Sequence, residues 1–213
     1  MDCAIAIEPP LDVVVRIGVL RCEVGRLEGS SPALEVALTE AADAVRRGDA
    51  AGTDAARALY RAFGIDPTRT RPSSEALLRR VRQGGPLPRI NAAVDVCNWC
   101  SLEAQLPFGL YDASAVDPPV ALRRGGPGDA YAGIRKDIVH LAGRPALFDA
   151  RGPFGNPTSD SARTMIGPHT SAVLAVVFAP SSVSGERMAR ILDMTAARLA
   201  EYAGGREADL WVS

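Results

Sequence analysis

The spacing of the apolar residues changes at Pro107, and this change divides the chain into a helical part and a strand-rich part. Before Pro107, apolar residues recur at intervals of three and four, which predicts helices over 32–47, 53–63, 73–83 and 91–105. The third helix is expected to have a serine cap and to stop at Gly84-Gly85. After Pro107, short apolar runs at 119–122, 131–134, 138–141 and 145–149 alternate with Gly- and Pro-rich turns, which is typical of strands in a sheet.

Four further segments complete the pattern. Residues 11–22 are rich in β-branched side chains and predict a strand, and the continuous apolar run at 171–180 predicts a buried strand. The clearest helical periodicity lies within 184–205, and 208–213 can form one more strand. Helices followed by strands and a closing helix indicate an α+β domain built around a mixed sheet.

Composition excludes several classes of protein. With 213 residues, 47% of them hydrophobic, the chain has too much apolar content for disorder. The start of the chain, with Asp2, does not predict a secretory signal, and the run Val13-Val14-Val15 is far too short for a membrane span. Four cysteines in a chain of this length do not predict a disulfide framework. We therefore expect a soluble, cytoplasmic protein.

Positive charge is concentrated between Arg57 and Arg89. This segment has eight arginines and only two acids, a net charge of +6, while the whole chain carries −1 and the remainder therefore −7. Clustered guanidinium groups match phosphate oxygens and attract polyanions. The alternative is a solvated helical face without a partner.

Cys97 and Cys100 form a C-x-x-C pair in the middle of the predicted helix 91–105. A structural zinc site needs about four ligands, and Cys3, Cys22, His140 and His169 have no matching spacing. A redox pair normally lies at the start of a helix, where the thiolate is stabilised. We therefore expect the two cysteines to pack as small apolar residues, with a metal or redox role as the alternative.

Asn91, Asp95 and Asn98 lie on one face of the same predicted helix, since they are spaced by four and three residues. Asn and Asp are poor helix formers, because their side chains compete for backbone hydrogen bonds. One explanation is an N-cap at Asn91 followed by an exposed face. The other is a polar helix edge that borders a pocket or a turn.

Familiar catalytic motifs are missing from the sequence. It contains no G-x-S-x-G, H-E-x-x-H or Walker-type loop. Residues 156–171 are dense in hydroxyl groups and include Asp160, Arg163 and His169. Such a loop before a buried strand can cradle an anion or carboxylate, or it can be an ordinary connection.

The segment "LPRINAAVDVCNWCSLEAQLPFG" resembles the hallmark of the B3/B4 domain found in the phenylalanyl-tRNA synthetase beta subunit. Eight residues match that hallmark in order: Ile90, Asn91, Val94, Asp95, Asn98, Leu102, Glu103 and Pro107. The residues before it look like the lead-in of stand-alone versions of this domain, and "SARTM" is similar to a Ser-x-Arg-Thr element late in them. We therefore expect one domain over 1–213, with a core at about 70–180, strand and helices in 1–69 and a helix and strand in 181–213.

The resemblance implies a three-layer β/β/α fold with mixed sheets, N-terminal helices and a long C-terminal helix. It also implies a post-transfer editing site, which in the synthetase hydrolyses tyrosine wrongly attached to the phenylalanine tRNA. We expect no metal or other cofactor. Asn98 matches an asparagine of that site, and Cys97 stands where the synthetase usually has threonine. The synthetase has a histidine where this chain has Gly109, and a glutamate before its closing segment, whereas 171–180 contains no acid.

These comparisons lead to a working hypothesis of an aminoacyl-tRNA-binding protein that hydrolyses a mischarged ester in trans. It assigns the catalytic role to Asn98, Ser161 and Thr164, with the substrate's ribose hydroxyl and a water taking part. Its other assignments are substrate contacts at Asn91, Asp95, Cys97, Gly109 and Arg163, and RNA contacts at Arg79, Arg80, Arg82 and Arg89. The alternative is a non-catalytic module that binds a free amino acid, another small carboxylate or a protein.

Overall fold

The computed structural model describes residues 4–25, 27, 29–134 and 137–213. Its helices are α1 (Pro32–Arg47), α2 (Asp54–Ala62), α3 (Ser73–Arg82), α4 (Ala92–Ala104) and α5 (Gly185–Ala203). Its strands are β1 (Ala6–Ile7), β2 (Val15–Glu23), β3 (Phe108–Asp112), β4 (Ala121–Arg124), β5 (Ala130–Ala132), β6 (Ile138–His140), β7 (Pro145–Asp149), β8 (Gly152–Asn156), β9 (Ser159–Asp160), β10 (Ala172–Pro180) and β11 (Arg206–Val212). Three short 3₁₀ helices occupy Leu11–Val13, Ala113–Ala115 and Ala162–Thr164.

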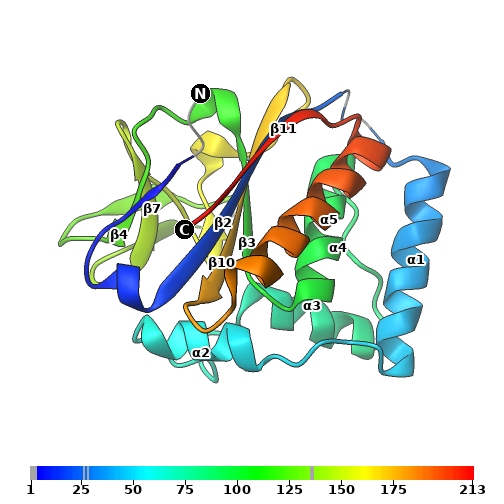
Figure 1. Ribbon diagram of the computed structural model, residues 1–213, viewed down its shortest axis with the longest axis horizontal. Helices are drawn as coiled ribbons and strands as arrows, with labels where there is room; N and C mark the ends of the chain where they lie inside the picture. Colours follow the sequence, from blue (N-terminus) through cyan, green and yellow to red (C-terminus); the bar gives the residue numbers. More distant parts are fainter. Residues whose placement is uncertain (1–3, 26, 28, 135–136) are drawn as a thin grey trace.

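The elements form three layers, which confirms the expected β/β/α arrangement (Figure 1). The outer layer is a five-stranded sheet in the order β1-β4-β7-β8-β9. The middle layer is a four-stranded antiparallel sheet in the order β11-β2-β10-β3. Helices α4 and α5 lie beside each other on the far side of the middle sheet, with α1 and α3 outside them. Because β1 runs parallel to β4 while the other pairs are antiparallel, the outer sheet is mixed.

Strand β10 lies at the centre of these layers, and its alternating side chains belong to two different cores. Val173, Ala175 and Val177 face the helices, whereas Val176 and Phe178 face the outer sheet. Successive side chains of a strand point to opposite faces, so a strand covered on both sides must be apolar throughout. This explains the uninterrupted apolar run from which a buried strand is predicted.

Capping residues determine where the helices begin and end. The Ser31 side chain accepts a hydrogen bond from the Leu34 amide at the start of α1, and Ser184 does the same for the Arg187 amide at α5. Gly48 and Gly204 end these two helices in the left-handed conformation that glycine tolerates. Helix α3 corrects one expectation: Ser73 is already helical, the N-cap is Pro72, and no side chain caps it.

Several strands differ from the sequence prediction. Strand β2 begins only at Val15, because Leu11–Val13 form a 3₁₀ turn, and β4 begins at Ala121, two residues later than expected. Strands β1, β3, β8 and β9 are not predicted from the sequence. They are short or contain glycine or proline, and pairing defines them as strands: β1 with β4, β3 with β10, β8 with β7 and β9 with β8.

The longest described helix, α5, has 19 residues and carries charged side chains along its length. Among the described residues, no helix combines the length and apolarity needed to cross a membrane.

Candidate functional site

Helix α4 presents the three polar residues of its predicted stripe, but they have different environments. The Asn91 side chain is the N-cap and accepts a 3.0 Å hydrogen bond from the Val94 amide. Asp95 is buried and accepts a 2.8 Å hydrogen bond from the Ile90 amide, and burial raises the pKa of its carboxyl group. These two residues therefore organise the turn at which α4 begins. Asn98, two turns into the helix, is half-buried.

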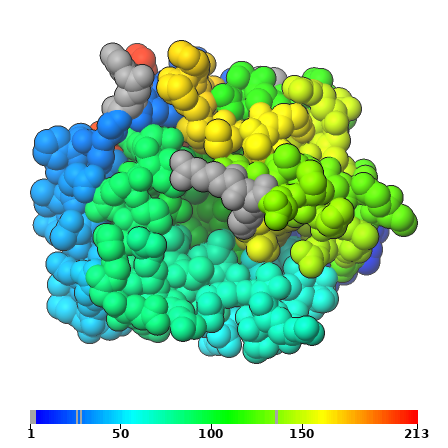
Figure 2. Space-filling view, turned by 180° about the vertical axis from the view of Figure 1, so that it is seen from behind, coloured from blue at the N-terminus to red at the C-terminus, as the bar shows by residue number. Residues whose placement is uncertain are grey.

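The Asn98 side chain lines a cleft between α3, α4, β3 and the loop before β9. The cleft has a wide half of about 550 Å³ and a narrow half of about 240 Å³. The two halves have four lining residues in common: Ser73, Asn98, Phe108 and Thr158. These shared residues therefore mark the boundary between the halves. Seen from behind, the molecule is hollowed between the cyan-to-green segments near α3 and the yellow-green strands of the outer sheet (Figure 2).

Among the described residues, the two halves of the cleft differ in charge. The wide half contains Arg71 and Arg80 and, among the described residues, no acid. Its remaining wall includes the apolar side chains of Ala76, Leu77 and Pro88. The narrow half contains Asp160 and, within the described part of the chain, no basic side chain. This polarity is a property of the folded chain, because Arg71 and Asp160 are far apart in sequence.

Asp160 influences three other groups in the protein, Tyr111, Tyr131 and Cys97. Burial, followed by the negative charge of Asp160, raises the pKa of Tyr111 and of Tyr131. Burial, the neighbouring Cys100 and Asp160 together raise the pKa of the Cys97 thiol, so Cys97 is not a reactive thiolate. The sequence contains Asp160 within the hydroxyl-rich loop, but nothing in the local pattern predicts its position opposite Asn98.

Gly109, for which the resemblance implies a histidine in the synthetase, does not line the cleft. It is buried in β3, and a Cβ atom there would lie 2.1 Å from the Tyr111 hydroxyl oxygen. A Cβ atom on Gly155 of β8 would lie 2.3 Å from the same oxygen. The Tyr111 ring, which packs edge-on against Phe154, therefore fills the space between these two glycines.

Ser161, Arg163 and Thr164 form a separate structural cluster. The Ser161 hydroxyl accepts a hydrogen bond from the Arg163 amide, and the Thr164 hydroxyl donates to the Phe154 carbonyl. The Arg163 guanidinium donates two 2.9 Å hydrogen bonds to the Asp149 carboxylate, whose side chain is fully buried. None of the three residues is part of the lining of either half of the cleft. The structure therefore places them away from Asn98, and their proposed roles remain predictions.

Cys97 and Cys100 are buried in the core between the helices and the middle sheet. Cys97 also forms part of the wide half's wall, whereas the Arg198 guanidinium lies 3.7 Å from the sulfur of Cys100. Among the described residues, no three or more His, Cys, Asp or Glu side chains gather as metal ligands would, and Cys3 lies outside them. The C-x-x-C pair is thus packed as the apolar interpretation predicts.

The arginine segment is divided between ion pairs and exposed cations. Arg57 and Arg71 pair with Glu75, and Arg89 pairs with Glu35 at 2.8 Å. On the last turns of α3, Arg79, Arg80 and Arg82 are exposed and form no ion pair with any described residue. Arg80 donates its Nε–H to the Pro86 carbonyl, and it also borders the wide half of the cleft. Of these three arginines, Arg80 lines the cleft, whereas Arg79 and Arg82 are exposed elsewhere on the same helix.

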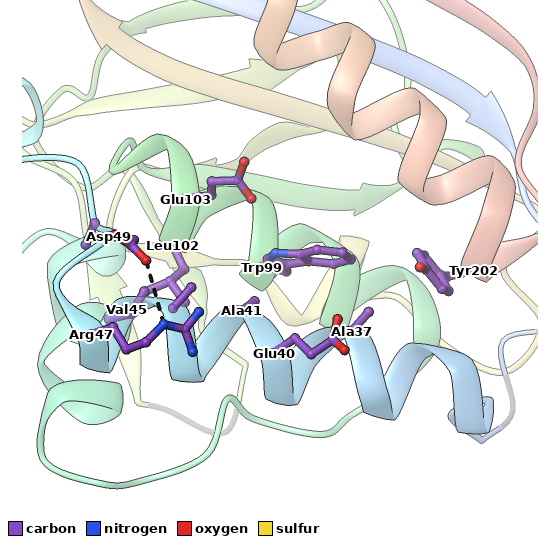
Figure 3. A pocket seen from close by; sticks show the side chains of 12 residues that line it. Ala37, Glu40, Ala41, Val45, Arg47, Asp49, Trp99, Leu102, Glu103 and Tyr202 are labelled. Carbon is purple, nitrogen blue, oxygen red and sulfur yellow. Dashed lines mark ion pairs between the residues drawn. The ribbon is translucent and has the colours of Figure 1, made fainter.

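A second groove of about 570 Å³ lies between α1 and the helices α4 and α5 (Figure 3). Ala37, Ala41 and Val45 of α1 face Trp99 and Leu102 of α4 across it. Two of its charged groups have ion-pair partners, since Arg47 lies 3.9 Å from Asp49 and Arg198 lies 2.6 Å from Glu103, whereas no ion pair with a described residue is formed by Glu40. The Arg198 guanidinium also covers the Trp99 ring at 3.7 Å. Much of the wall of this groove is therefore apolar or engaged in ion pairs.

The two sheets and the helical layer define an α+β domain, and the polar cleft lies between the helices and the edge of the sheets. The B3/4 domain family model matches residues 55–203, and the chain belongs to this family. A search of curated proteins gave no match.

One solved structure is similar over nearly the whole chain: the N-terminal fragment of the phenylalanyl-tRNA synthetase beta-subunit from Pyrococcus horikoshii. The TM-score is 0.50 and the sequence identity 15%, and the alignment covers 97% of this chain. It covers 50% of the fragment, so the chain spans about half the fragment's length. At this identity the likeness shows the fold alone.

Proposed function

We propose that the protein binds the aminoacylated end of a tRNA in the Asn98 cleft and hydrolyses a mischarged amino acid in trans. The observation that carries this proposal is that Arg71 and Arg80 line the Asn98 cleft, while the exposed Arg79 and Arg82 add positive charge on the same helix α3. Arginine side chains can bind the RNA phosphates, and the side-chain amide of Asn98 in the cleft can contact the ester at the end of the RNA. The B3/4 family and the similarity to a phenylalanyl-tRNA synthetase fragment support an RNA ligand of this kind. We place this activity in the cytoplasm, where charged tRNA is found.

The chemistry assigned to Asn98 is stabilisation of the oxyanion. A water oxygen adds to the ester carbonyl carbon, and the Asn98 amide donates a hydrogen bond to the oxygen that becomes negative. The water's proton passes through the neighbouring ribose hydroxyl to the leaving ribose oxygen, and the carbon–oxygen bond breaks. The products are the free amino acid and uncharged tRNA, and the substrate itself supplies the proton relay.

Deacylation of a panel of mischarged tRNAs tests the hydrolytic part of this proposal. We expect one or a few amino acids to be released faster than in the absence of protein. Asn98→Ala should lower kcat/KM by roughly a hundredfold to a thousandfold, as loss of an oxyanion donor does elsewhere, while tRNA binding is kept. Full activity in Asn98→Ala would contradict the role given to this residue.

The salt dependence of tRNA binding tests the cationic surface. The triple variant Arg79→Ala, Arg80→Ala, Arg82→Ala should bind more weakly, with a salt slope reduced by up to about three. Three exposed arginines outside the segment provide a matched control, in the variant Arg151→Ala, Arg190→Ala, Arg206→Ala. Equal loss of binding in the two triple variants would indicate non-specific attraction.

A non-catalytic module is the second candidate, and the placement of Ser161, Thr164 and Gly109 favours it. Both hydroxyls are bonded to the backbone, and Gly109 gives the cleft no side chain. In that case the cleft holds a free amino acid or another small carboxylate, or the chain binds a protein. Saturable amino-acid binding without deacylation of any mischarged tRNA would support this candidate.

A further inference from the structure

We infer that Thr158 holds the attacking water in the Asn98 cleft, and that Tyr60 turns the Thr158 hydroxyl so that it can only accept a hydrogen bond from this water. Thr158 lies in the turn between β8 and β9 and lines the cleft. Tyr60 lies on α2, behind that turn, and is not itself part of the lining. The inference rests on the proposed function and supplies the water site that its mechanism requires.

The direction of the Thr158 hydroxyl follows from the number of protons available. The Tyr60 hydroxyl oxygen lies 3.0 Å from the Pro157 carbonyl oxygen and 3.0 Å from the Thr158 hydroxyl oxygen. A carbonyl oxygen can only accept, so the single hydroxyl proton of Tyr60 is donated to Pro157. The contact between the two hydroxyl groups then uses the proton of Thr158. Thr158 therefore offers only oxygen lone pairs to any further group.

Tyr60 is suited to fix this direction, because it is fully buried and keeps its proton. Burial raises the pKa of Tyr60 to about 12, and hydrogen bonds from the Thr158 hydroxyl and the Ser73 backbone oppose this rise only in part. The phenol is therefore a donor at neutral pH. The Ser73 hydroxyl also donates to the Pro157 carbonyl, at 3.4 Å, and a carbonyl oxygen has room for both donors.

The backbone of Thr158 is also held in place. Pro157 and Thr158 connect β8 to β9, since Asn156 pairs with Ser159 across the hairpin. The buried Asn156 side chain accepts a 2.8 Å hydrogen bond from the Thr158 amide and a 2.9 Å hydrogen bond from the Ser159 amide. The Thr158 hydroxyl is therefore an acceptor that is oriented before a substrate binds, which lowers the cost of reaching the transition state.

The attacking water needs such an acceptor. Thr158 and Asn98 line both halves of the cleft, so they border the region where the ester of the proposed substrate lies. To aim a lone pair at the carbonyl carbon, the water directs one hydrogen to the ribose hydroxyl and the other to Thr158. The first proton passes through the ribose hydroxyl to the leaving oxygen. The second stays on the attacking oxygen, becomes part of the free carboxylic acid and is then lost to solvent.

Kinetics of deacylation test this water site, with the mischarged tRNA that the wild type deacylates fastest. Thr158→Val removes the hydroxyl at nearly constant volume and should lower kcat about tenfold, with KM changed by less than about twofold, because the water is bound in the reaction and not by the free tRNA. Thr158→Ser keeps the hydroxyl and should restore most of kcat. Tyr60→Phe frees the Thr158 hydroxyl to rotate and should lower kcat by about threefold to tenfold.

Tyr131→Phe is the matched control for Tyr60→Phe. The Tyr131 hydroxyl donates to the Ser159 carbonyl, so this variant loses a tyrosine hydroxyl on the same turn and leaves the Thr158 hydroxyl bonded to Tyr60. Its kcat should stay within about twofold of the wild type. Equal loss of kcat in the two variants would reduce the role of Tyr60 to rigidity of the turn. Unchanged kcat in Thr158→Val, or a rise in KM alone, would overturn the inference.

Neutron diffraction from deuterium-exchanged crystals of the wild type tests the direction of the hydroxyl groups without any substrate. The deuteron of Tyr60 should point to the Pro157 carbonyl, and that of Thr158 to the Tyr60 oxygen. A Tyr60 deuteron directed at Thr158 would overturn the inference, whatever the activity. If no mischarged tRNA is deacylated, the proposed hydrolysis and the water site fall together. If deacylation is insensitive to Thr158→Val, only the present inference fails.

Discussion

At the scale of single residues, Gly109 is the position where this chain departs most clearly from its family resemblance. The structure gives a physical reason for the missing side chain, because the Tyr111 hydroxyl occupies the space that it would need. The same ring is buried between the two sheets against Phe154. A histidine at position 109, as the resemblance implies for the synthetase, is therefore incompatible with Tyr111 in its present position.

We predict that Gly109→Ala destabilises the protein by about 1–3 kcal/mol, because the new methyl group overpacks the layer between the sheets. Urea unfolding measures this loss. Gly126→Ala is the matched control, since its Cβ atom would lie 3.8 Å from the nearest neighbour. The loss should shrink in a Tyr111→Leu background, and an unchanged unfolding midpoint for Gly109→Ala would contradict this account.

The Asp149–Arg163 pair predicts a dependence of stability on pH. Burial raises the pKa of Asp149, but hydrogen bonds from Arg163 and from the Asp117 and Arg151 amides outweigh it and hold the pKa below its ordinary value. A carboxyl group with a lowered folded-state pKa stabilises the fold above its unfolded pKa, and this contribution is lost as the pH falls through the folded value. The stabilisation by Asp149 should therefore be complete at neutral pH and decrease progressively as the pH falls below about 4, toward the lowered folded-state pKa.

Asp149→Asn should lower the free energy of unfolding at pH 7 by about 2–3 kcal/mol, because it leaves Arg163 without its charged partner. Urea unfolding of the wild type and the variant at pH 7 and pH 3 measures the difference. The two proteins should be more alike at pH 3 than at pH 7. A constant difference across this range would mean that the charge of Asp149 contributes nothing.

At the scale of elements, helix α4 combines structural and candidate functional residues within two turns. Asn91 and Asp95 hold its first turn, whereas Asn98 faces the cleft. The sequence predicts the helix and its polar stripe correctly. It does not distinguish capping residues from cleft residues, because that depends on which neighbours α4 packs against.

Replacing the cap of α4 separates these roles. Asn91→Ala should cost about 1 kcal/mol of stability, because the Val94 amide loses its hydrogen-bond acceptor. Asn91→Ser keeps an acceptor and should retain most of the stability, as thermal unfolding can show. If Asn91→Ser keeps its stability but loses binding of a cleft ligand, Asn91 contacts the substrate in addition to capping the helix.

At the scale of the whole molecule, β10 joins the two cores, since it supplies side chains to both. Trp99 packs against the helix-side core and Trp211 against the core between the sheets. Because neither core can open without exposing one face of β10, we expect the three layers to unfold together.

Single-tryptophan variants test this cooperativity. In Trp211→Phe the fluorescence of Trp99 reports on the helix-side core, and in Trp99→Phe the fluorescence of Trp211 reports on the other core. Within each variant, the urea midpoint from fluorescence should coincide with that from far-ultraviolet circular dichroism. Separate midpoints would show that one layer unfolds on its own.

The sequence by itself determined the helices, the central strand and the B3/4 resemblance. These depend on local signals: apolar spacing, capping residues such as Ser31 and Gly204, and the fixed spacing from Ile90 to Pro107. Strands β8 and β9 have no such signal, since Gly, Pro, Asn and Ser dominate 152–160, and only pairing across the sheet defines them.

The tertiary structure decided which polar residues share the cleft. Arg71, Asn98 and Asp160 come from three distant segments, and packing of α3 and α4 against the edge of the sheets brings them together. It also decided that the Tyr111 ring fills the space at Gly109. Both results depend on contacts between residues far apart in the chain or in different layers, and such contacts leave no periodic pattern in a single sequence.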